Sequence, residues 1–315
     1  MPHNDDSLAL MLLCLPMSAE GEPAVKPFTP AETEWLAGRL EAASLSFGSL
    51  AGKDVSGVMQ LLDVRDEIAY RICILMDRDM LLSRLLEHCL ETNTEILTPC
   101  DDGYPRRVTA RLGRYGSPLL FVKGDTDMLS LSYLAILGIP GVKTPPAIES
   151  TIKRLVPISA ANGLAIMTGG ELGTGRIVRD EVLSGEGLLA CVLTGGMEAF
   201  AAENANKRAL ENGNLLLISQ PHPLAAPNAI DAAERNRLIY ALSSVTAVTA
   251  TDGKRGEAEA VRRRLCDNLY VYESASLPAN AALAGRGFRL LKENELPDLS
   301  TARTPDADAE QLSFL

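Results

Sequence analysis

The stretch that decides the fold is Leu-Ala-Ile-Met-Thr-Gly-Gly-Glu-Leu-Gly-Thr-Gly, residues 164–175. Its first residues form a short apolar run, which is typical of a buried strand. A helical pattern begins at Arg176, and the turn between them contains Gly169, Gly170, Gly173 and Gly175. A strand that passes through a glycine-rich turn into a helix can hold an anion with backbone N–H groups and the helix N-terminus. The pattern also fits an ordinary tight connection in an α/β sheet, so the turn alone leaves both interpretations open.

Apolar runs alternate with helical patterns on both sides of this stretch. Continuous apolar strands separated by helices indicate a parallel sheet that is covered on both faces. We therefore expect a Rossmann-like, doubly wound α/β fold with six mainly parallel strands over residues 130–275. The predicted strands are 133–138, 164–168, 188–193, 215–218, 245–250 and 269–272, with a short edge strand at 288–291. The predicted helices lie near 146–161, 176–185, 199–212, 230–243 and 256–266.

The chain before this region is predicted to be helical. One helix is expected from Ala31 to Ala43, after the start signal Thr29-Pro30, and two more between Val64 and Leu90. The Pro-, Gly- and Glu-rich segment 18–28 is expected to be a loop, and residues 297–315 to be disordered. The predicted organisation is a helical domain, a Rossmann-type domain and a flexible tail, at 1–93, 94–292 and 293–315.

Composition indicates an ordinary globular protein, with 46% apolar and 23% charged residues. Aromatic residues make up only 4% of the chain, which argues against a surface built mainly on base stacking. The six cysteines include no C-x-x-C pair, which favours reduced thiols in the cytoplasm and argues against a zinc site. The apolar run 8–17 follows two acidic residues, unlike a signal peptide, and no segment has the roughly 18 apolar residues of a membrane span. We expect no membrane association.

The net charge of −11 is unevenly distributed. Residues 1–100 contain sixteen acidic and seven basic side chains, whereas residues 101–275 contain nineteen of each. Within the balanced region, the segment 235–264 holds seven basic residues against three acidic ones. One face of the central domain is therefore expected to be locally positive, as nucleic-acid binding requires.

Two basic motifs are candidates for phosphate binding. The first is Arg235-Asn236-Arg237, near the start of a predicted helix, and arginine presents a planar fork that suits phosphate. Residues two positions apart on a helix point about 200° from one another, so we expect one arginine to face a ligand. The other would brace the domain, either by pairing with a carboxylate such as Glu234 or Asp231 or by bonding backbone carbonyls. Solvated or salt-bridged arginines are the alternative interpretation.

The second motif is the glycine-flanked turn Asp252-Gly253-Lys254-Arg255-Gly256, between a predicted strand and helix. Its backbone N–H groups and basic side chains can hold phosphate, although an exposed basic connection fits equally well. In a doubly wound sheet the ligand crevice lies at the carboxyl ends of the strands, where further glycines and threonines occur. The candidate DNA- or phosphate-binding residues are Gly138, Thr168, Gly169, Gly170, Gly173, Thr174, Gly195, Gly196, Arg235, Asn236, Arg237, Gly253, Lys254 and Arg255.

No catalytic set is evident in the sequence. His3, His88 and His222 have no carboxylate or nucleophile at a recognisable spacing. We therefore expect no catalytic residues, no metal and no cofactor, and no hydrolysis of nucleoside monophosphates or of DNA.

The order of these motifs resembles the DNA-processing protein A family (DprA, also called Smf), within the SLOG nucleotide-binding superfamily. The most family-like piece is the lead-in Asp102-Gly103-Tyr104-Pro105 followed by Ser117-Pro118 and Leu119 to Gly124, similar to D-x-x-Y-P … P-x-x-L-F-x-K-G. The segment 168–173 stands at the place of S-G-x-A-x-G, and Arg235-Asn236-Arg237 at that of R-N-R-I. The resemblance covers about 94–292 and identifies the chain as a diverged member.

The divergence concerns charged positions of the family pattern. Its G-S-R is Gly138-Ile139-Pro140 here, and its aspartate and histidine fall on Gly175 and Arg179. Its S-G-S turn is replaced by residues 253–256, so that Lys143, Lys254 or Arg255 would supply the lost positive charge.

The resemblance implies non-catalytic binding of single-stranded DNA and loading of a RecA-type recombinase during the uptake of transforming DNA. The implied partners are single-stranded DNA, that recombinase and a second copy of the chain in a homodimer. Two alternatives remain open. The crevice could serve a SLOG-type sensor of a small nucleotide. Residues 169–174 also echo the P-G-G-x-G-T-x-x-E motif of LOG-like nucleoside-monophosphate phosphoribohydrolases, with an extra residue and without its proline and glutamate.

Overall fold

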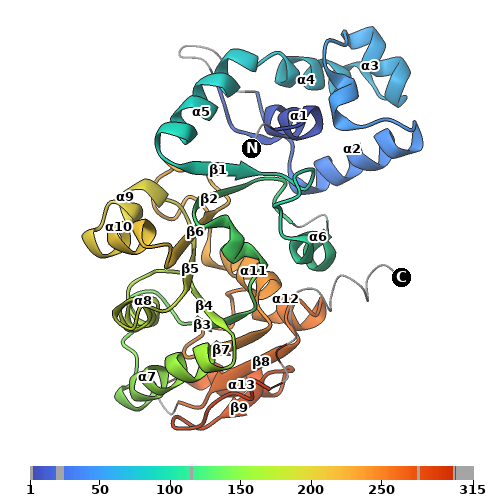
Figure 1. The fold of residues 1–315 in the computed structure, drawn as a ribbon. Helices are drawn as coiled ribbons and strands as arrows, with labels where there is room; N and C mark the ends of the chain where they lie inside the picture. The colour runs from blue at the N-terminus through green and yellow to red at the C-terminus, as the bar shows by residue number, and fades with distance from the viewer. Residues whose placement is uncertain (1–2, 19–24, 114–115, 275–276, 301, 303–315) are drawn as a thin grey trace. The chain divides into compact units, whose positions relative to one another are not determined.

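The computed structural model describes residues 3–18, 25–113, 116–274, 277–300 and 302. The chain divides into two compact units (Figure 1). The first comprises residues 1–104 and 113–121, and the second comprises residues 105–112 and 122–315. Of the segments expected to be irregular, residues 19–24, 301 and 303–315 lie outside the described residues.

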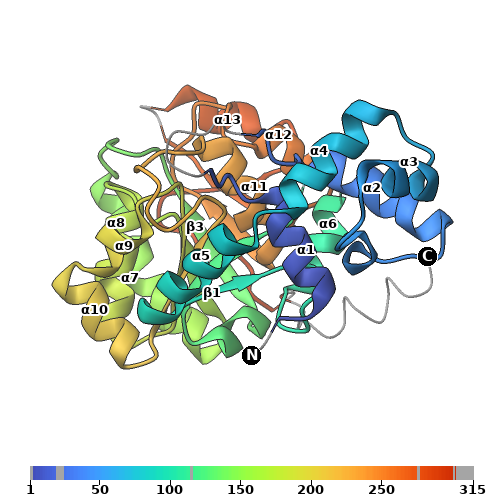
Figure 2. The same ribbon diagram turned by 90° about the horizontal axis from the view of Figure 1, so that it is seen from above.

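The first unit is helical, as the sequence predicts. Helix α1 is its centre: it packs against η1, α4 and α5 (Figures 1 and 2), and Leu10, Met11 and Leu13 on it are at most 2% exposed. Helix α2 begins at a capping box in which Thr29 and Glu32 bond each other's backbone N–H groups. The elements are α1 (Asp5–Cys14), α2 (Pro30–Ala42), η1 (Phe47–Leu50), α3 (Val55–Leu62), α4 (Asp66–Met76), α5 (Asp79–Glu91) and β1 (Thr94–Leu97).

The strands hydrogen-bond in the order β1-β2-β6-β5-β4-β3-β7-β8-β9. From β6 to β9 every pairing is parallel, which confirms the expected sheet and its edge strand at β9. All residues of the strands from β3 to β8 are buried, which is why the sequence shows them as unbroken apolar runs. The strands are β2 (Leu120–Gly124), β3 (Tyr133–Leu137), β4 (Ala165–Thr168), β5 (Leu189–Leu193), β6 (Leu215–Ser219), β7 (Val245–Val248), β8 (Asn268–Tyr272) and β9 (Arg289–Leu291).

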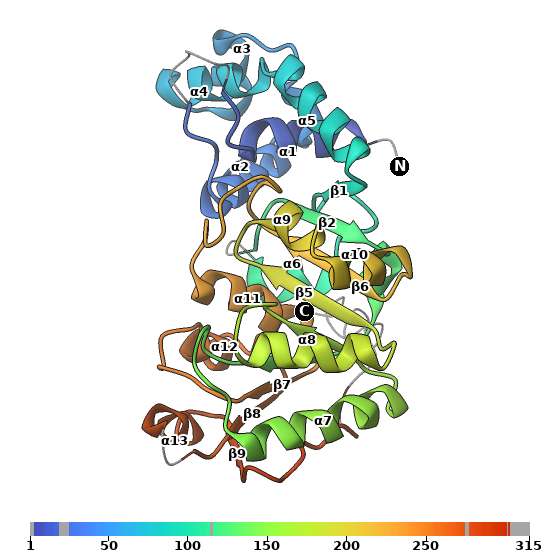
Figure 3. The same ribbon diagram turned by 90° about the vertical axis from the view of Figure 1, so that its left-hand side faces the viewer.

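Helices cover both faces of the sheet in the second unit (Figures 1 and 3). One face carries α7 (Pro146–Ala161), α8 (Thr174–Ser184), α9 (Met197–Ala201) and α10 (Asn204–Glu211). The opposite face carries α6 (Arg106–Leu112), α11 (Ala232–Leu242) and α12 (Glu257–Arg262), while η3 (Thr126–Ser130) and α13 (Pro278–Ala284) complete the unit. The single helix expected over 199–212 is wrong. The chain breaks between α9 and α10, where buried Asn206 donates from Nδ2 to the carbonyl oxygen of Phe200.

The sheet has a topological switch point between β3 and β7. These two strands are neighbours, yet the helices that follow them, α7 and α12, cover opposite faces. In such sheets the connections at the carboxyl ends separate on either side of the switch point and leave room for a ligand. The candidate residues after β3, β4 and β7 therefore share one edge of the sheet.

Candidate nucleic-acid interface

The glycine turn after β4 is occupied by an ion pair. Arg235 on α11 reaches Glu171 within the turn, with Nη1–Oε2 at 2.8 Å and Nη2–Oε1 at 3.2 Å. The two groups lie directly against Gly169, where a Cβ atom would overlap both of them. The Arg235 side chain is 2% exposed and the Glu171 side chain 15%. This two-pronged geometry is the strong form of an arginine–carboxylate bond.

Arg235 makes bracing contacts of both expected kinds, to a carboxylate and to a backbone carbonyl, but the carboxylate is neither of the two that the sequence suggested. Its side chain extends from α11 to the glycine turn, where it pairs with Glu171 instead of Glu234 or Asp231, and its Nη1 also donates to the carbonyl oxygen of Val192 at 3.4 Å. Arg237 is 27% exposed and lies 3.6 Å from the Glu259 carboxylate. Neither arginine is without a counter-ion.

Asn236, between them, connects the two basic motifs. Its Oδ1 accepts a hydrogen bond from Nε of Arg235 at 2.8 Å, and its Nδ2 donates to the carbonyl oxygen of Arg255 at 3.1 Å. The side chain is buried, so both bonds form away from water. The R-N-R helix and the basic turn are thus held as one structural element.

Three linked threonine hydroxyls lie where β3 ends, and two of them, on Thr174 and Thr249, are next to Gly138. Thr174 Oγ1 lies 2.9 Å from Thr144 Oγ1 and 2.8 Å from Thr249 Oγ1, and the last hydroxyl donates to the carbonyl oxygen of Leu137 at 3.0 Å. A Cβ atom at Gly138 would lie 2.5 Å from the Thr174 hydroxyl. All three threonines are buried, so this chain of hydrogen bonds joins the loops after β3, β4 and β7.

The backbone N–H groups of the basic turn are already bonded within the chain. Gly253 donates to Thr251 Oγ1 at 2.8 Å, Lys254 to Asp252 Oδ1 at 3.0 Å, and Arg255 to Glu257 Oε2 at 2.7 Å. The Arg255 guanidinium also lies 3.3 Å from the Asp252 carboxylate. These three N–H groups are therefore not available to an anion, and the exposed Lys254 side chain is the group of the turn that could bind one.

The loop 220–231 folds over the glycines that follow β5. Gly196 donates its N–H to the carbonyl oxygen of Ala225 at 2.8 Å, and Ile230 donates to that of Thr194 at 3.1 Å. A Cβ atom at Gly195, whose φ is +140°, would overlap the carbonyl oxygen of Ala226. At these two positions the absence of a side chain allows the backbone of the loop to pass close to the backbone after β5.

Exposed positive charge remains on three connections at the same edge. Lys143 lies in the loop after β3, Arg176 in the first turn of α8 and Lys254 in the turn after β7. Arg176 lies 3.6 Å from Asp180, with its side chain 60% exposed. The Lys143 loop covers the glycine turn, because Gly141 donates its N–H to the carbonyl oxygen of Leu172 at 3.1 Å.

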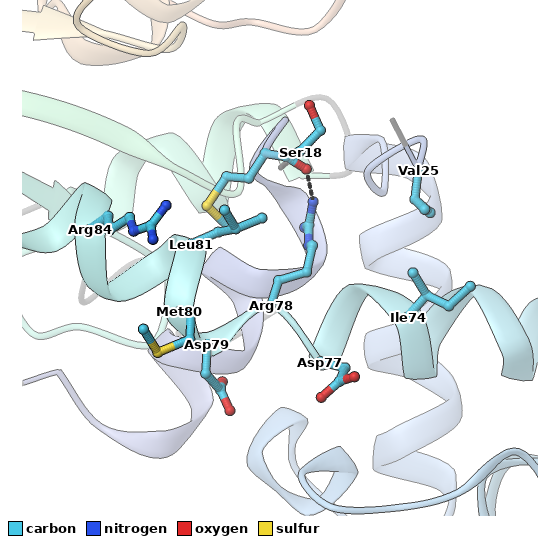
Figure 4. Close-up of a pocket in the computed structure, with 10 residues that line it drawn as sticks. Ser18, Val25, Ile74, Asp77, Arg78, Asp79, Met80, Leu81 and Arg84 are labelled. Atoms are coloured by element: carbon cyan, nitrogen blue, oxygen red, sulfur yellow. Dashed lines mark hydrogen bonds between the residues drawn. The ribbon is translucent and has the colours of Figure 1, made fainter. Parts of the chain in front are cut away.

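A cavity of about 580 Å³ lies elsewhere, in the first unit, between Met17 and Ser18, the end of α4 and the start of α5 (Figure 4). Arg78 lines it and donates to the carbonyl oxygens of Leu12, Leu15 and Met17. None of the candidate residues lines this cavity. Among the described residues, no group of three or more His, Cys, Asp or Glu could hold a metal ion. No helix in the described part of the chain is long and apolar enough to cross a membrane.

Comparison with known proteins identifies the family of the chain. Residues 95–285 match the model of the family described as DNA recombination-mediator protein A. No curated protein matches the chain.

Among solved structures, the chain is similar to DNA processing protein A (DprA) from Streptococcus pneumoniae, with 18% identity and a TM-score of 0.62 over 85% of this chain and 96% of that one. It is also similar to DNA processing protein A from Helicobacter pylori, described with a single-stranded DNA binding mode (20% identity, TM-score 0.49, 69% and 96% covered). A third similar structure is the molybdenum cofactor binding protein from Rippkaea orientalis (15% identity, TM-score 0.37, 58% and 96% covered).

Proposed function

The chain belongs to the DNA recombination-mediator protein A family, and from this premise we propose that it binds single-stranded DNA along the carboxyl edge of its parallel sheet. Its broad role is DNA processing, as for the family. The protein acts as a binding protein rather than as a catalyst, and a RecA-type recombinase and a second copy of the chain are its proposed partners.

The observation that carries this proposal is the placement of Lys143 and Lys254. They follow β3 and β7, the neighbouring strands at the switch point, and both side chains are exposed. The arginines of the R-N-R helix are paired with carboxylates, so the lysines are the cations best placed to meet a phosphate from solvent. Because the two lysines lie in the loops after neighbouring β-strands, we propose that they contact phosphates of the same DNA strand.

Titration with oligo-dT at two salt concentrations tests the proposal. Binding through phosphate contacts must weaken steeply with salt, because each neutralised phosphate releases condensed counterions. We expect Lys143→Ala and Lys254→Ala each to reduce the slope of log K against log [salt] by about 0.7, the single-strand value per contact. Lys207→Ala, an exposed lysine on α10, is the matched control and should leave the slope unchanged.

The competing function, sensing of a small nucleotide, predicts a different result. A mononucleotide would bind with only a shallow salt dependence and would compete with oligo-dT for the same crevice. A wild-type protein that binds mononucleotides and not oligo-dT would therefore contradict the DNA-binding proposal. Release of free base from a nucleoside monophosphate would instead favour the phosphoribohydrolase alternative.

A further inference from the structure

The surroundings of the Glu171 carboxylate are those of an anion-binding site. The Arg235 guanidinium meets it with two hydrogen bonds, at 2.8 and 3.2 Å. The eleven-residue helix α8 begins three residues later, and Glu171 Oε2 lies 3.4 Å from the position of a Cβ atom at Gly175 in its first turn. A helix N-terminus, an arginine fork and glycines without side chains are the components with which proteins bind phosphate.

A second observation concerns the residue that precedes the glycine turn. The hydroxyl of Thr168, the residue directly before Gly169, is buried and has no hydrogen-bond partner in the described structure. Buried hydroxyls are almost always bonded, because an unmade hydrogen bond away from water costs free energy. A buried hydroxyl without a partner therefore ends β4, in the residue next to the glycine turn that Arg235 reaches.

We propose that Glu171 is a specificity-determining residue that occupies a latent phosphate site with its own carboxylate. A free phosphate group would have to displace this carboxylate, which is tethered to the chain and already pairs with both prongs of Arg235. The native site is therefore closed to a mononucleotide phosphate, while the exposed lysines outside it remain accessible to a polynucleotide. Proteins often gain specificity in this way, by a group that disfavours the unwanted ligand. Here the Glu171 carboxylate would exclude a free phosphate group.

Removal of the carboxylate tests this assignment. Glu171→Ala leaves the buried Arg235 without a counter-ion, so the variant should melt at a lower temperature than the wild type. Inorganic phosphate should then bind Arg235 and raise the melting temperature of the variant in a saturable way. The expected rise is about 5–10 °C at a concentration of about 100 times Kd.

The matched control is Glu203→Ala. Glu203 also pairs with a buried arginine, Arg179, at 2.8 Å, but it lies outside the glycine turn. The control and the wild type should show only the general stabilisation that phosphate gives to any folded protein. Equal saturable gains in all three proteins, or a folded Glu171→Ala variant with no extra gain, would overturn the proposal.

Glu171→Gln keeps the measurement decisive if Glu171→Ala does not fold. The amide retains the shape and one acceptor for Arg235 but carries no charge, so phosphate should displace it more easily than the native carboxylate. A folded Glu171→Gln variant that responds to phosphate like the wild type would contradict the assignment. The inference does not rest on DNA binding by the lysines: the phosphate response and the oligo-dT salt slope can fail independently.

Discussion

Asn236 donates a hydrogen bond from Nδ2 to the carbonyl oxygen of Arg255 over 3.1 Å, and this bond fixes α11 to the basic turn after β7. The same side chain accepts from Nε of Arg235 at 2.8 Å. One buried amide therefore sets the position of an arginine on one element and of a glycine-flanked turn on another. The middle residue of the R-N-R motif is a structural link as much as a candidate ligand contact.

Asn236→Asp should keep one of the two hydrogen bonds of this side chain and remove the other. The carboxylate keeps the acceptor for Arg235 but has no donor for the Arg255 carbonyl, so two buried oxygen atoms would face each other. We expect a loss of about 1–3 kcal/mol in the free energy of unfolding, measured by urea denaturation. A loss below about 0.5 kcal/mol would show that the turn keeps its place without this bond.

Arg235→Ala and Arg237→Ala should differ strongly in stability. Arg235→Ala leaves the Glu171 carboxylate unpaired in a buried place, and breaking such a pair costs about 3–5 kcal/mol. Arg237 is partly exposed and its distance to Glu259 is 3.6 Å, so its loss should cost about 1 kcal/mol or less. Thermal melts of the two variants provide the measurement, and similar losses would refute the division of roles.

Gly195→Ala should destabilise the second unit more than Gly253→Ala does. Both glycines have positive φ, +140° and +76°, so alanine is strained at either position. Only at Gly195 would the new Cβ also overlap a backbone carbonyl, that of Ala226, whereas nothing lies within 4 Å of it at Gly253. We expect about 1 kcal/mol at Gly253 and a clearly larger loss at Gly195 in denaturant unfolding. The reverse order would mean that the loop 220–231 does not cross Gly195 as described.

The ion pair between Glu32 and Arg71 should make the first unit sensitive to acid. Hydrogen bonds from the Arg71 guanidinium lower the pKa of Glu32 from 4.5 to about 2. Because the folded-state pKa is the lower one, this stabilisation is complete above pH 4.5 and is lost as the pH falls toward 2.

Glu32→Gln tests the acid response. The variant should be less stable than the wild type at pH 7, and the difference should shrink as the pH falls from 4.5 to 2. The urea midpoint at several pH values measures it, with exposed Glu41→Gln as the control. A difference that does not change with pH would assign the effect to the capping box alone.

The fold could be predicted from the sequence because its strands are buried on both faces. Each of the six central strands is a run of mainly apolar residues with helical periodicity on either side. This pattern predicts the α/β class and the order of strands and helices along the chain. The break between α9 and α10 could not be predicted in this way, since it depends on one side-chain bond, from Asn206 to the carbonyl oxygen of Phe200.

The contacts of the site were less accessible to prediction. Glu171 and Arg235 are 64 residues apart, and no periodicity connects a glycine turn with a helix that follows two strands later. The signal that was present is Glu171 itself, an acidic residue inside a turn whose glycines suit an anion. Thr174 was among the candidate residues, but its partners Thr144 and Thr249 gave no signal, because isolated threonines occur in many buried positions.

The pairing of β3 with β7 has a consequence for how the chain acquires its structure. Leu134 pairs with Val245, so β3, an internal strand of the sheet, acquires its second neighbour only after 111 further residues have been synthesised. At about 5–20 residues per second this takes roughly 6–20 s, during which one edge of β3 has no partner on the side of β7. Contacts so distant along the chain also slow folding, because loop closure must precede them. The switch point that creates the ligand edge therefore forms late in synthesis, and until then the wholly apolar β3 has one open edge that another strand could pair with.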